Sequence, residues 1–345
     1  MSNPDLVSVA ARLMAPGKGL LAIDESVSTA NKRFAAEGIP QTEEMRRAWR
    51  EVILTIQGLG EAVSGAILFD ETIRHKTSAG VPFTQLLRDA GIGIGIKVDE
   101  GTVPLPGHAG ETMTEGLDGL RQRLKDYREM GAEFAKWRAV ITIGAGLPSR
   151  AGLAANAHGL SLYAALCQEA GLVPIVEPEV LMDGDHSLER CFEVTSETLE
   201  VVFAHLKTQG VQLEGMLLKP NMVVPALDAP RQASPEEIAT ATLTCLERHV
   251  PAAVAGIAFL SGGQTGPEAT ARLNAMNLPD TKAKEGGALP WPVTFSFGRA
   301  IQEPALHIWH GDAANTKAAQ DALLHRARLD SAARRGAYTP AMEKA

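Results

Sequence analysis

The chain has 345 residues and a formal net charge of −8, with 33 Lys and Arg residues against 41 Asp and Glu residues. Hydrophobic residues make up 45% and charged residues 21%, a composition that excludes disordered and fibrous proteins. The acidic balance argues against a nucleic-acid partner, which would need a basic face to bind phosphates. Cys167, Cys191 and Cys245 lack the spacing of a disulfide scaffold or zinc site, which favours a cytoplasmic protein.

The sequence predicts no association with a membrane. The first residues include Asp5 and lack the basic-then-apolar order of a signal peptide. The longest stretch without Lys, Arg, Asp or Glu covers residues 249–267, but two prolines and four glycines interrupt it. Such a stretch is unsuited to a membrane-spanning helix.

Short apolar runs that end on polar residues or glycine recur about every 39 residues along the chain. Near-continuous apolar runs of this kind are typical of strands buried on both faces of a parallel sheet. The eight runs cover residues 19–24, 65–70, 91–99, 134–141, 172–180, 215–223, 256–263 and 291–300.

The segments between these runs predict helices. Thr42 caps an acidic first turn, residues 120–130 are amphipathic, and Ser234 opens a capping box with Pro235 at the first helical position. Alternating strands and helices disfavour a propeller or a helical repeat, although both have a similar period. We therefore predict an α/β protein that forms a single (β/α)8 barrel over residues 1–345. A short helix at about 5–15 precedes the barrel, and a short tail at about 336–345 follows it.

Charged side chains interrupt the apolar runs at corresponding positions. Lys97, Lys136 and Lys219 each follow an apolar strand pattern, where a charge is costly unless a carboxylate or ligand pairs with it. Glu177 and Glu179 lie two residues apart and share one strand face, so they can offset that charge. The carboxyl ends of barrel strands meet at one mouth, which predicts an active site for acid–base chemistry there.

Two late segments favour a phosphate site. SGGQTGPE, which contains Ser261, Gly262 and Gly263, offers backbone N–H groups without obstructing side chains, and FSFGR adds a glycine and a guanidinium. A metal site is not expected. The histidines of HIWH and the acidic residues of DGDH suit solvated or core positions better than known ligand spacings.

A series of motifs along the chain carries a family resemblance. In order they are GKGLLAIDES, ETIRHKT, GIKVDEGTVPLPG, GETMTEGLDGL, GAEFAKWRAV, VPIVEPEVLMDGDH, LLKPNMV, FLSGGQ and FSFGRA. Together they resemble class I fructose-bisphosphate aldolase from about residue 5 to residue 340. The resemblance implies a TIM barrel lyase of glycolysis and gluconeogenesis that is cytoplasmic, homotetrameric and free of metal and cofactor. It also implies reversible cleavage of fructose 1,6-bisphosphate to dihydroxyacetone phosphate and glyceraldehyde 3-phosphate.

The resemblance also implies roles for individual residues. Lys219 would form a Schiff base with the substrate, Glu177 would shuttle protons, and Glu179 would act in catalysis or pair with a neighbouring cation. The remaining catalytic residues would be Lys136 and Asp24. The substrate and phosphate contacts would come from Arg138, Lys97, Ser26, Thr29, Lys32, Arg33, Ser261, Gly262, Gly263, Ser296, Gly298 and Arg299.

Three features depart from the family pattern. Thr29 stands where the family has a serine in the first loop, which keeps a hydroxyl but alters that phosphate contact. Extra residues occur near 281–290. The animal enzymes end in a mobile tail with a terminal tyrosine, whereas here the last segment is YTPAMEKA and its tyrosine is Tyr338. We expect water or a group on the barrel to supply the proton that the animal tyrosine helps to deliver.

Several alternatives share the predicted fold. A sugar-phosphate isomerase would need acid–base groups but no imine, and a sugar-phosphate sensor would need no catalysis, because fold alone does not determine function. A metal-dependent aldolase would need clustered histidine ligands, which the sequence lacks. The sequence also leaves open the choice between bisphosphate and monophosphate sugars.

Overall fold

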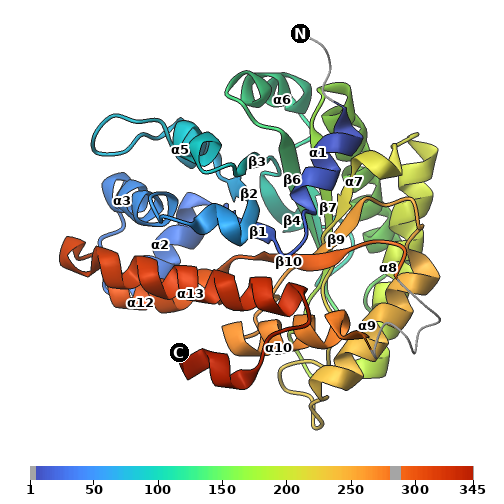
Figure 1. The fold of residues 1–345 in the computed structure, drawn as a ribbon. Helices are drawn as coiled ribbons and strands as arrows, with labels where there is room; N and C mark the ends of the chain where they lie inside the picture. Colours follow the sequence, from blue (N-terminus) through green and yellow to red (C-terminus); the bar gives the residue numbers. More distant parts are fainter. Residues whose placement is uncertain (1–4, 280–288, 345) are drawn as a thin grey trace.

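The computed structural model, which describes residues 5–279 and 289–344, contains a closed parallel barrel of eight strands (Figure 1). The strands follow the order β1-β10-β9-β8-β7-β6-β3-β2 around the barrel. They are β1 (Gly19–Ile23), β2 (Val63–Leu68), β3 (Gly93–Lys97), β6 (Phe134–Ile141), β7 (Val173–Val180), β8 (Leu217–Leu218), β9 (Gly256–Phe259) and β10 (Val293–Phe297). Each of the eight predicted apolar runs overlaps one of these strands, so the predicted barrel is confirmed.

Helices surround the barrel and connect its strands (Figure 1). They are α1 (Leu6–Leu13), α2 (Val27–Ala36), α3 (Glu43–Leu54), α4 (Asp70–Arg74), α5 (Phe83–Asp89), α6 (Leu120–Glu129), α7 (Arg150–Glu169), α8 (Leu188–Thr208), α9 (Pro235–His249), α10 (Gly266–Asn277), α12 (Arg299–Trp309) and α13 (Thr316–Arg334), with 3₁₀ turns η1 (Leu59–Glu61), η2 (Leu213–Gly215), η3 (Ala313–Asn315) and η4 (Pro340–Lys344). Among the described helices, none has both the length and the apolar character needed to cross a bilayer. Most of the insertion predicted near 281–290 lies outside the described residues.

Capping interactions fix where several helices begin. Thr42 accepts a hydrogen bond from the backbone N–H of Met45 at the start of α3. Ser234 and Glu237 form the predicted capping box of α9, with Pro235 at the first helical position. These contacts satisfy N–H groups that a helix leaves unpaired in its first turn. The predicted starts of both helices are confirmed.

Helix α1 packs against the amino-terminal ends of the barrel strands. Its buried side chains, including Leu13, join a cluster inside the barrel with Phe134 and other strand residues. Gly95 leaves room for the Phe134 ring, because a Cβ on Gly95 would lie 2.1 Å from it. The barrel is therefore filled at this end, and its open space lies at the carboxyl ends of the strands.

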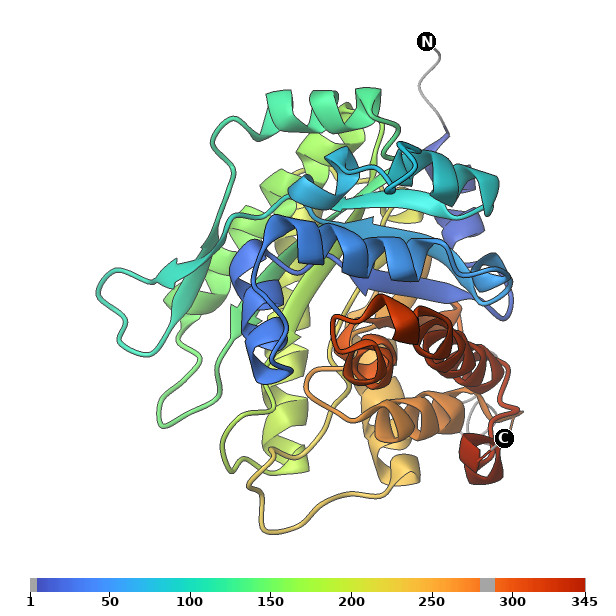
Figure 2. The same cartoon turned by 90° about the vertical axis from the view of Figure 1, so that its left-hand side faces the viewer.

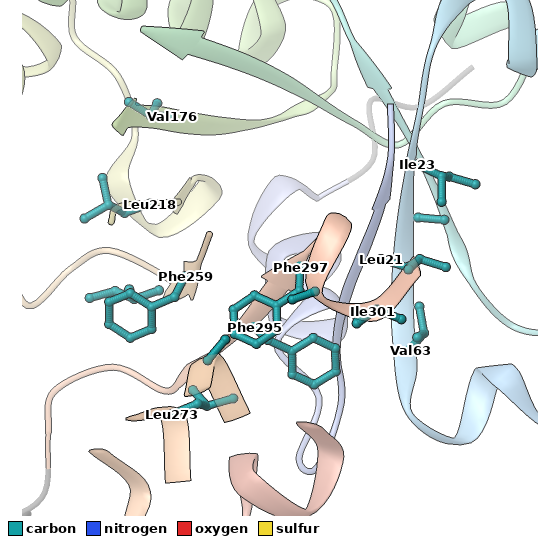
Figure 3. Close-up of a cluster of buried hydrophobic side chains, with 14 of the residues drawn as sticks. Leu21, Ile23, Val63, Val176, Leu218, Phe259, Leu273, Phe295, Phe297 and Ile301 are labelled. Atoms are coloured by element: carbon teal, nitrogen blue, oxygen red, sulfur yellow. The ribbon is translucent and has the colours of Figure 1, made fainter. Parts of the chain in front are cut away.

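A second apolar layer lies between the strands and the surrounding helices. Phe295 and Phe297 of β10 pack with their ring centroids 5.7 Å apart. Figure 3 shows them beside Ile301 of α12 and Leu273 of α10. This layer ties the last barrel strand to helices that follow β9 and β10, so the loops between them have rigid supports.

A hairpin between β3 and β6 interrupts the alternation of strands and helices. Its two short strands, β4 (Gly101–Pro104) and β5 (Thr112–Glu115), pair antiparallel and extend away from the barrel (Figure 2). The sequence reasoning did not predict this hairpin. All but one residue of its four-residue strands are half-exposed or exposed, so the strands carry little of the hydrophobic pattern that reveals a buried strand.

Candidate active site

A cavity of about 1220 Å³ opens at the carboxyl ends of the barrel strands. Every residue that the sequence singled out as catalytic or phosphate-binding lines this cavity, although they come from seven strands or the loops that follow them. The lining residues lie at different positions along their strands. Lys97 ends β3, whereas its register partner Lys136 lies near the start of β6, which continues to Ile141. The cavity therefore has charged groups at its floor as well as at its rim.

Two lysines and two carboxylates form a chain of contacts on the cavity floor. Nζ of Lys219 lies 3.1 Å from Oε1 of Glu177, and Nζ of Lys136 lies 3.1 Å from Oε2 of the same carboxylate. Lys136 also lies 2.7 Å from Oδ2 of Asp24. The side chains of both lysines and of Glu177 are each no more than 5% exposed. Glu177 therefore lies between the two lysine nitrogens instead of leaving them in direct contact.

The charges of this cluster determine its protonation. Burial opposes ionisation of Asp24 and Glu177, but the positive charges of Lys136 and Lys219 outweigh it and lower the pKa of both carboxyls. For Lys136, burial favours the neutral amine, but Asp24 and Glu177 outweigh it and raise the pKa. Lys136 is therefore a permanent cation at neutral pH, and the ligand-free site holds two carboxylates.

Glu177 has spare hydrogen-bonding capacity. The position of Lys136 relative to Glu177 Oε2 is close enough for an ion pair but does not meet hydrogen-bond geometry. Oε2 has no hydrogen-bond partner among the described residues, although it is buried. A buried carboxylate oxygen without a partner is costly, which suits a group that contacts a substrate.

Arg138 and Glu179 form an ion pair between neighbouring strands, in which the guanidinium donates to Glu179 Oε2. Burial disfavours the charged guanidinium, but Glu179 outweighs that effect and raises the pKa of Arg138. Glu179 is thus engaged with a cation in the ligand-free protein. This contact agrees with the pairing alternative for Glu179 rather than with a free acid or base.

The two late turns present backbone donors to the cavity. Gly262 and Gly263 both have positive φ angles, 53° and 89°, which side-chain-bearing residues rarely adopt. Gly298 precedes α12 without a side-chain cap, so the first N–H groups of that helix remain available. Ser296 has a buried hydroxyl with no partner among the described residues, and Arg299 begins the helix. Such a helix start beside a cation favours an anion.

The first loop is already organised without a ligand. Ser26 caps α2 by accepting from the N–H of Thr29, and the two hydroxyl oxygens lie 3.0 Å apart. Arg33 forms an ion pair with Glu25, whose other oxygen lies 2.6 Å from Arg50. The Thr29 hydroxyl therefore lies beside that of Ser26 at the start of α2, and Glu25 neutralises part of the Arg33 charge. Lys32 also lines the cavity.

Two acidic residues near the site escaped the sequence reasoning. The Glu25 side chain is only 8% exposed, and Gln302 donates to one of its oxygens at 2.8 Å. Asp99 ends the run that contains Lys97 and binds its ammonium group. The position of Asp99 at the end of an apolar run was a signal that could have identified it. The sequence around Glu25 does not distinguish this residue from acidic residues on the surface.

One group of side chains in the described residues has the spacing to hold a metal ion: Glu43, Glu71 and His75. None of the three lines the cavity. Both oxygens of Glu71 accept hydrogen bonds from Arg46, at 2.7 and 2.6 Å. That carboxylate is therefore committed to a guanidinium, and the group gives no support for metal chemistry.

A closed β/α barrel whose mouth joins buried lysine–carboxylate pairs to anion-binding turns is the arrangement of an enzyme for phosphorylated substrates. Comparison with known proteins identifies the family. The sequence model of the family "Fructose-bisphosphate aldolase class-I" matches residues 5–345. The chain therefore belongs to the class I fructose-bisphosphate aldolase family, which confirms the resemblance inferred from the motifs.

Individual relatives agree across almost the whole chain. A protein of Xanthomonas campestris pv. campestris named "Probable fructose-bisphosphate aldolase class 1" is 53% identical over 98% of this chain and 99% of its own length. "Fructose-bisphosphate aldolase 6, cytosolic" of Arabidopsis thaliana is 50% identical over 97% of this chain and 91% of its own. The solved fructose-bisphosphate aldolase of Plasmodium falciparum superposes with a TM-score of 0.93 at 44% identity, covering 97% and 95% of the two chains.

Proposed function

We propose that this chain reversibly cleaves fructose 1,6-bisphosphate to dihydroxyacetone phosphate and glyceraldehyde 3-phosphate through a Schiff base on Lys219. The observation that carries the proposal is the position of the Lys219 amine. It lies 3.1 Å from the Glu177 carboxylate inside a cavity that also holds anion-binding turns. The family and the relatives named above support the substrate.

The reaction needs an electron sink beside the bond that breaks. The Lys219 amine attacks the C2 carbonyl, and loss of water gives a protonated imine, which accepts electrons better than a ketone. Removal of the C4 hydroxyl proton then breaks the C3–C4 bond, and its electron pair moves into the imine to form an enamine. Glyceraldehyde 3-phosphate leaves, C3 takes up a proton, and hydrolysis releases dihydroxyacetone phosphate and restores the amine.

We assign Glu177 as the residue that carries protons in these steps. One of its oxygens contacts Lys219 and the other has no hydrogen-bond partner among the described residues, so it can exchange protons with the departing water and with the C4 hydroxyl. Lys136 stays charged, holds Glu177 in place and stabilises developing negative charge. Asp24 stays ionised, as its lowered pKa indicates, and orients substrate hydroxyls and the iminium.

Barrel order supports an assignment of the two substrate phosphates. Lys219 follows β8, which pairs with β9, and β10 follows β9, so the turns after β9 and β10 lie on one side of the imine. The C1 phosphate is attached one carbon from the imine carbon and fits these turns, with Ser261, Gly262 and Arg299. The C6 phosphate is four carbons away and fits Lys97 and Arg138, which belong to β3 and β6 on the other side of β8.

We further propose that residues 1–345 act as one catalytic domain in a cytoplasmic homotetramer. The family resemblance supports the tetramer, and the printed name of the Arabidopsis relative supports the location. Light scattering of the purified protein tests the assembly, because a tetramer has about four times the mass of the 36.6 kDa chain.

A coupled assay of the purified chain tests the activity. We expect cleavage of fructose 1,6-bisphosphate that is lost in Lys219→Arg, because a guanidinium stays protonated and forms no imine. Lys317→Arg, on an exposed lysine of α13, is the matched control and should retain the wild-type rate. Interconversion of sugar phosphates without carbon–carbon cleavage would favour an isomerase instead.

A further inference from the structure

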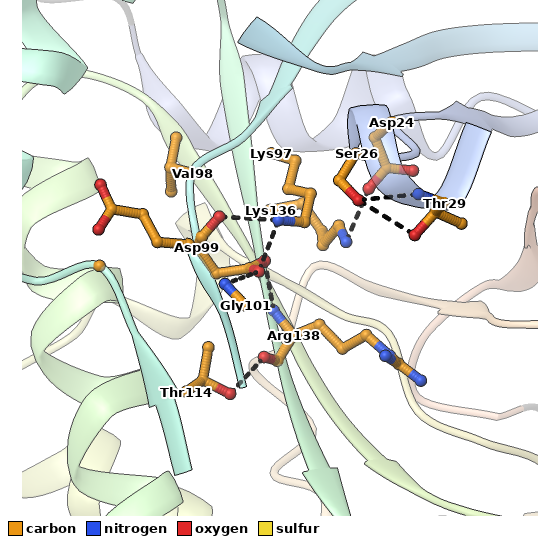
Figure 4. Close-up of polar contacts among 12 residues, drawn as sticks. Asp24, Ser26, Thr29, Lys97, Val98, Asp99, Gly101, Thr114, Lys136 and Arg138 are labelled. Atoms are coloured by element: carbon orange, nitrogen blue, oxygen red, sulfur yellow. Dashed lines mark hydrogen bonds and ion pairs between the residues drawn. The ribbon is translucent and has the colours of Figure 1, made fainter. Parts of the chain in front are cut away.

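Asp99 holds the ammonium group of Lys97 in two ways. Nζ of Lys97 donates to the backbone carbonyl of Asp99 at 2.7 Å and lies 2.7 Å from its Oδ1 (Figure 4). The Asp99 side chain is only 4% exposed, whereas that of Lys97 is 15% exposed and faces the cavity. Asp99 therefore holds the Lys97 ammonium group by one hydrogen bond and one ion pair, while that group still faces the cavity.

The same carboxylate also fixes the backbone that carries Arg138. Its Oδ2 accepts from the N–H of Arg138 at 3.2 Å, and its Oδ1 accepts from the N–H of Gly101 at 3.3 Å. Thr114, on the second strand of the hairpin, donates its hydroxyl to the Arg138 carbonyl at 2.8 Å (Figure 4). Asp99 and the hairpin thus connect β3 and β6 at Lys97 and Arg138, whose side chains are the two cations.

Two opposite consequences for phosphate binding follow from this arrangement. The negative charge of Asp99 weakens the attraction of Lys97 for an anion, whereas its fixed position removes the freedom of a long and flexible side chain. The hydrogen bonds from the N–H groups of Gly101 and Arg138 favour the second consequence. They immobilise the Asp99 carboxylate and connect it to the backbone of Arg138. Ordering of the Lys97 ammonium group and of the Arg138 backbone offsets the partial neutralisation of Lys97, since a flexible side chain loses entropy when a ligand orders it.

We propose that Asp99 is a positioning residue for the phosphate that lies far from the imine, acting through Lys97 and Arg138. The proposal rests on the proposed function and adds a determinant of the preference for bisphosphate over monophosphate sugars. Fructose 1-phosphate has no phosphate at C6, so it provides an internal reference for general damage to the site.

The test compares Asp99→Asn with wild type on both substrates. We expect KM for fructose 1,6-bisphosphate to rise about tenfold, equivalent to about 1.4 kcal/mol, with kcat within about threefold. The kcat/KM for fructose 1-phosphate should stay within about twofold. An equal loss on both substrates would show a merely structural role. An unchanged or lower KM for the bisphosphate would show that neutralisation of Lys97 dominates. Either result overturns the proposal.

Three controls complete the test. Glu115→Gln removes a negative charge from an exposed side chain of β5 that does not line the cavity, and it should leave the kinetics on both substrates unchanged. If Asp99→Asn does not fold, Thr114→Val tests the contact with Arg138 instead. We expect this variant to raise KM for the bisphosphate by less than tenfold and to leave KM for fructose 1-phosphate unchanged. An unchanged KM for the bisphosphate would contradict the proposal. Borohydride trapping of dihydroxyacetone phosphate on wild-type Lys219 tests the proposed function separately from the role of Asp99. Failure of trapping would reject the proposed function itself.

Discussion

The Oε1 atom of Glu177 lies 3.1 Å from Nζ of Lys219, while its second oxygen faces Lys136 at the same distance. One carboxylate thus contacts the amine that we propose as the nucleophile and a second lysine that cannot lose its proton at neutral pH. Since burial alone would favour the neutral acid, the two lysines are what keep Glu177 ionised in the ligand-free site.

Glu177→Gln should lower kcat for fructose 1,6-bisphosphate by a factor of about 10²–10⁴, the usual contribution of a positioned acid–base group. The amide keeps the size of the carboxylate but cannot carry a proton. Steady-state kinetics measure the loss, and circular dichroism checks the fold. A kcat within threefold of wild type would reject Glu177 as the proton carrier.

Arg299→Ala should raise KM for fructose 1,6-bisphosphate and fructose 1-phosphate alike, because both have the C1 phosphate that we assign to the turns after β9 and β10. A charge-assisted hydrogen bond contributes about 1.5–3 kcal/mol, which corresponds to a rise of about 10- to 150-fold. Kinetics on the two substrates measure it. An effect restricted to the bisphosphate would place Arg299 at the other phosphate.

Treatment with EDTA should leave the rate of bisphosphate cleavage unchanged, because a lysine imine supplies the electron sink. The measurement compares dialysed enzyme with and without EDTA, and with added zinc. A rate that falls with EDTA and returns with zinc would support a metal-dependent mechanism instead.

Asp330 should make stability depend on pH. Burial raises the pKa of this carboxyl in α13 to about 7, although Arg326 and Thr270 act to lower it. A carboxyl whose pKa is higher in the folded state binds its proton more tightly there. It therefore contributes stability below about pH 4, and that contribution is lost as pH rises toward about 7.

Asp330→Asn removes this dependence because the amide does not ionise. We subtract the free energy of unfolding of the wild type from that of the variant at each pH. This difference should increase by on the order of 2 kcal/mol from pH 5 to pH 8. Urea unfolding at the two pH values measures the difference. A difference that is the same at both would show that Asp330 does not titrate in this range.

The barrel was predictable because its strands are buried on both faces and so form near-continuous apolar runs. The charged residues of the cavity floor were predictable for the same reason, since Lys136 and Lys219 interrupt such runs. Strand lengths were not predictable. The run at 215–223 contains only two strand residues, Leu217 and Leu218, before Lys219 and Pro220, whereas β6 and β7 each continue for eight residues.

Contacts between distant segments account for what the sequence reasoning missed. The hairpin that supports Arg138 has short, half-exposed strands, so no hydrophobic period marks it. The role of Asp99 depends on the N–H of a residue 39 positions away, and that of Glu25 on Arg50 and Gln302. Glu179 was predicted to act in catalysis or to pair with a cation, and only the structure names Arg138 as its partner.

Covalent trapping at Lys219 tests the central claim most directly. We expect borohydride reduction in the presence of dihydroxyacetone phosphate, followed by peptide mass mapping, to find a three-carbon phosphate adduct on Lys219. Lys219→Arg should fold, as judged by circular dichroism, and should show no adduct and no cleavage of the bisphosphate. An adduct on another lysine, or active enzyme that forms no adduct, would contradict the account.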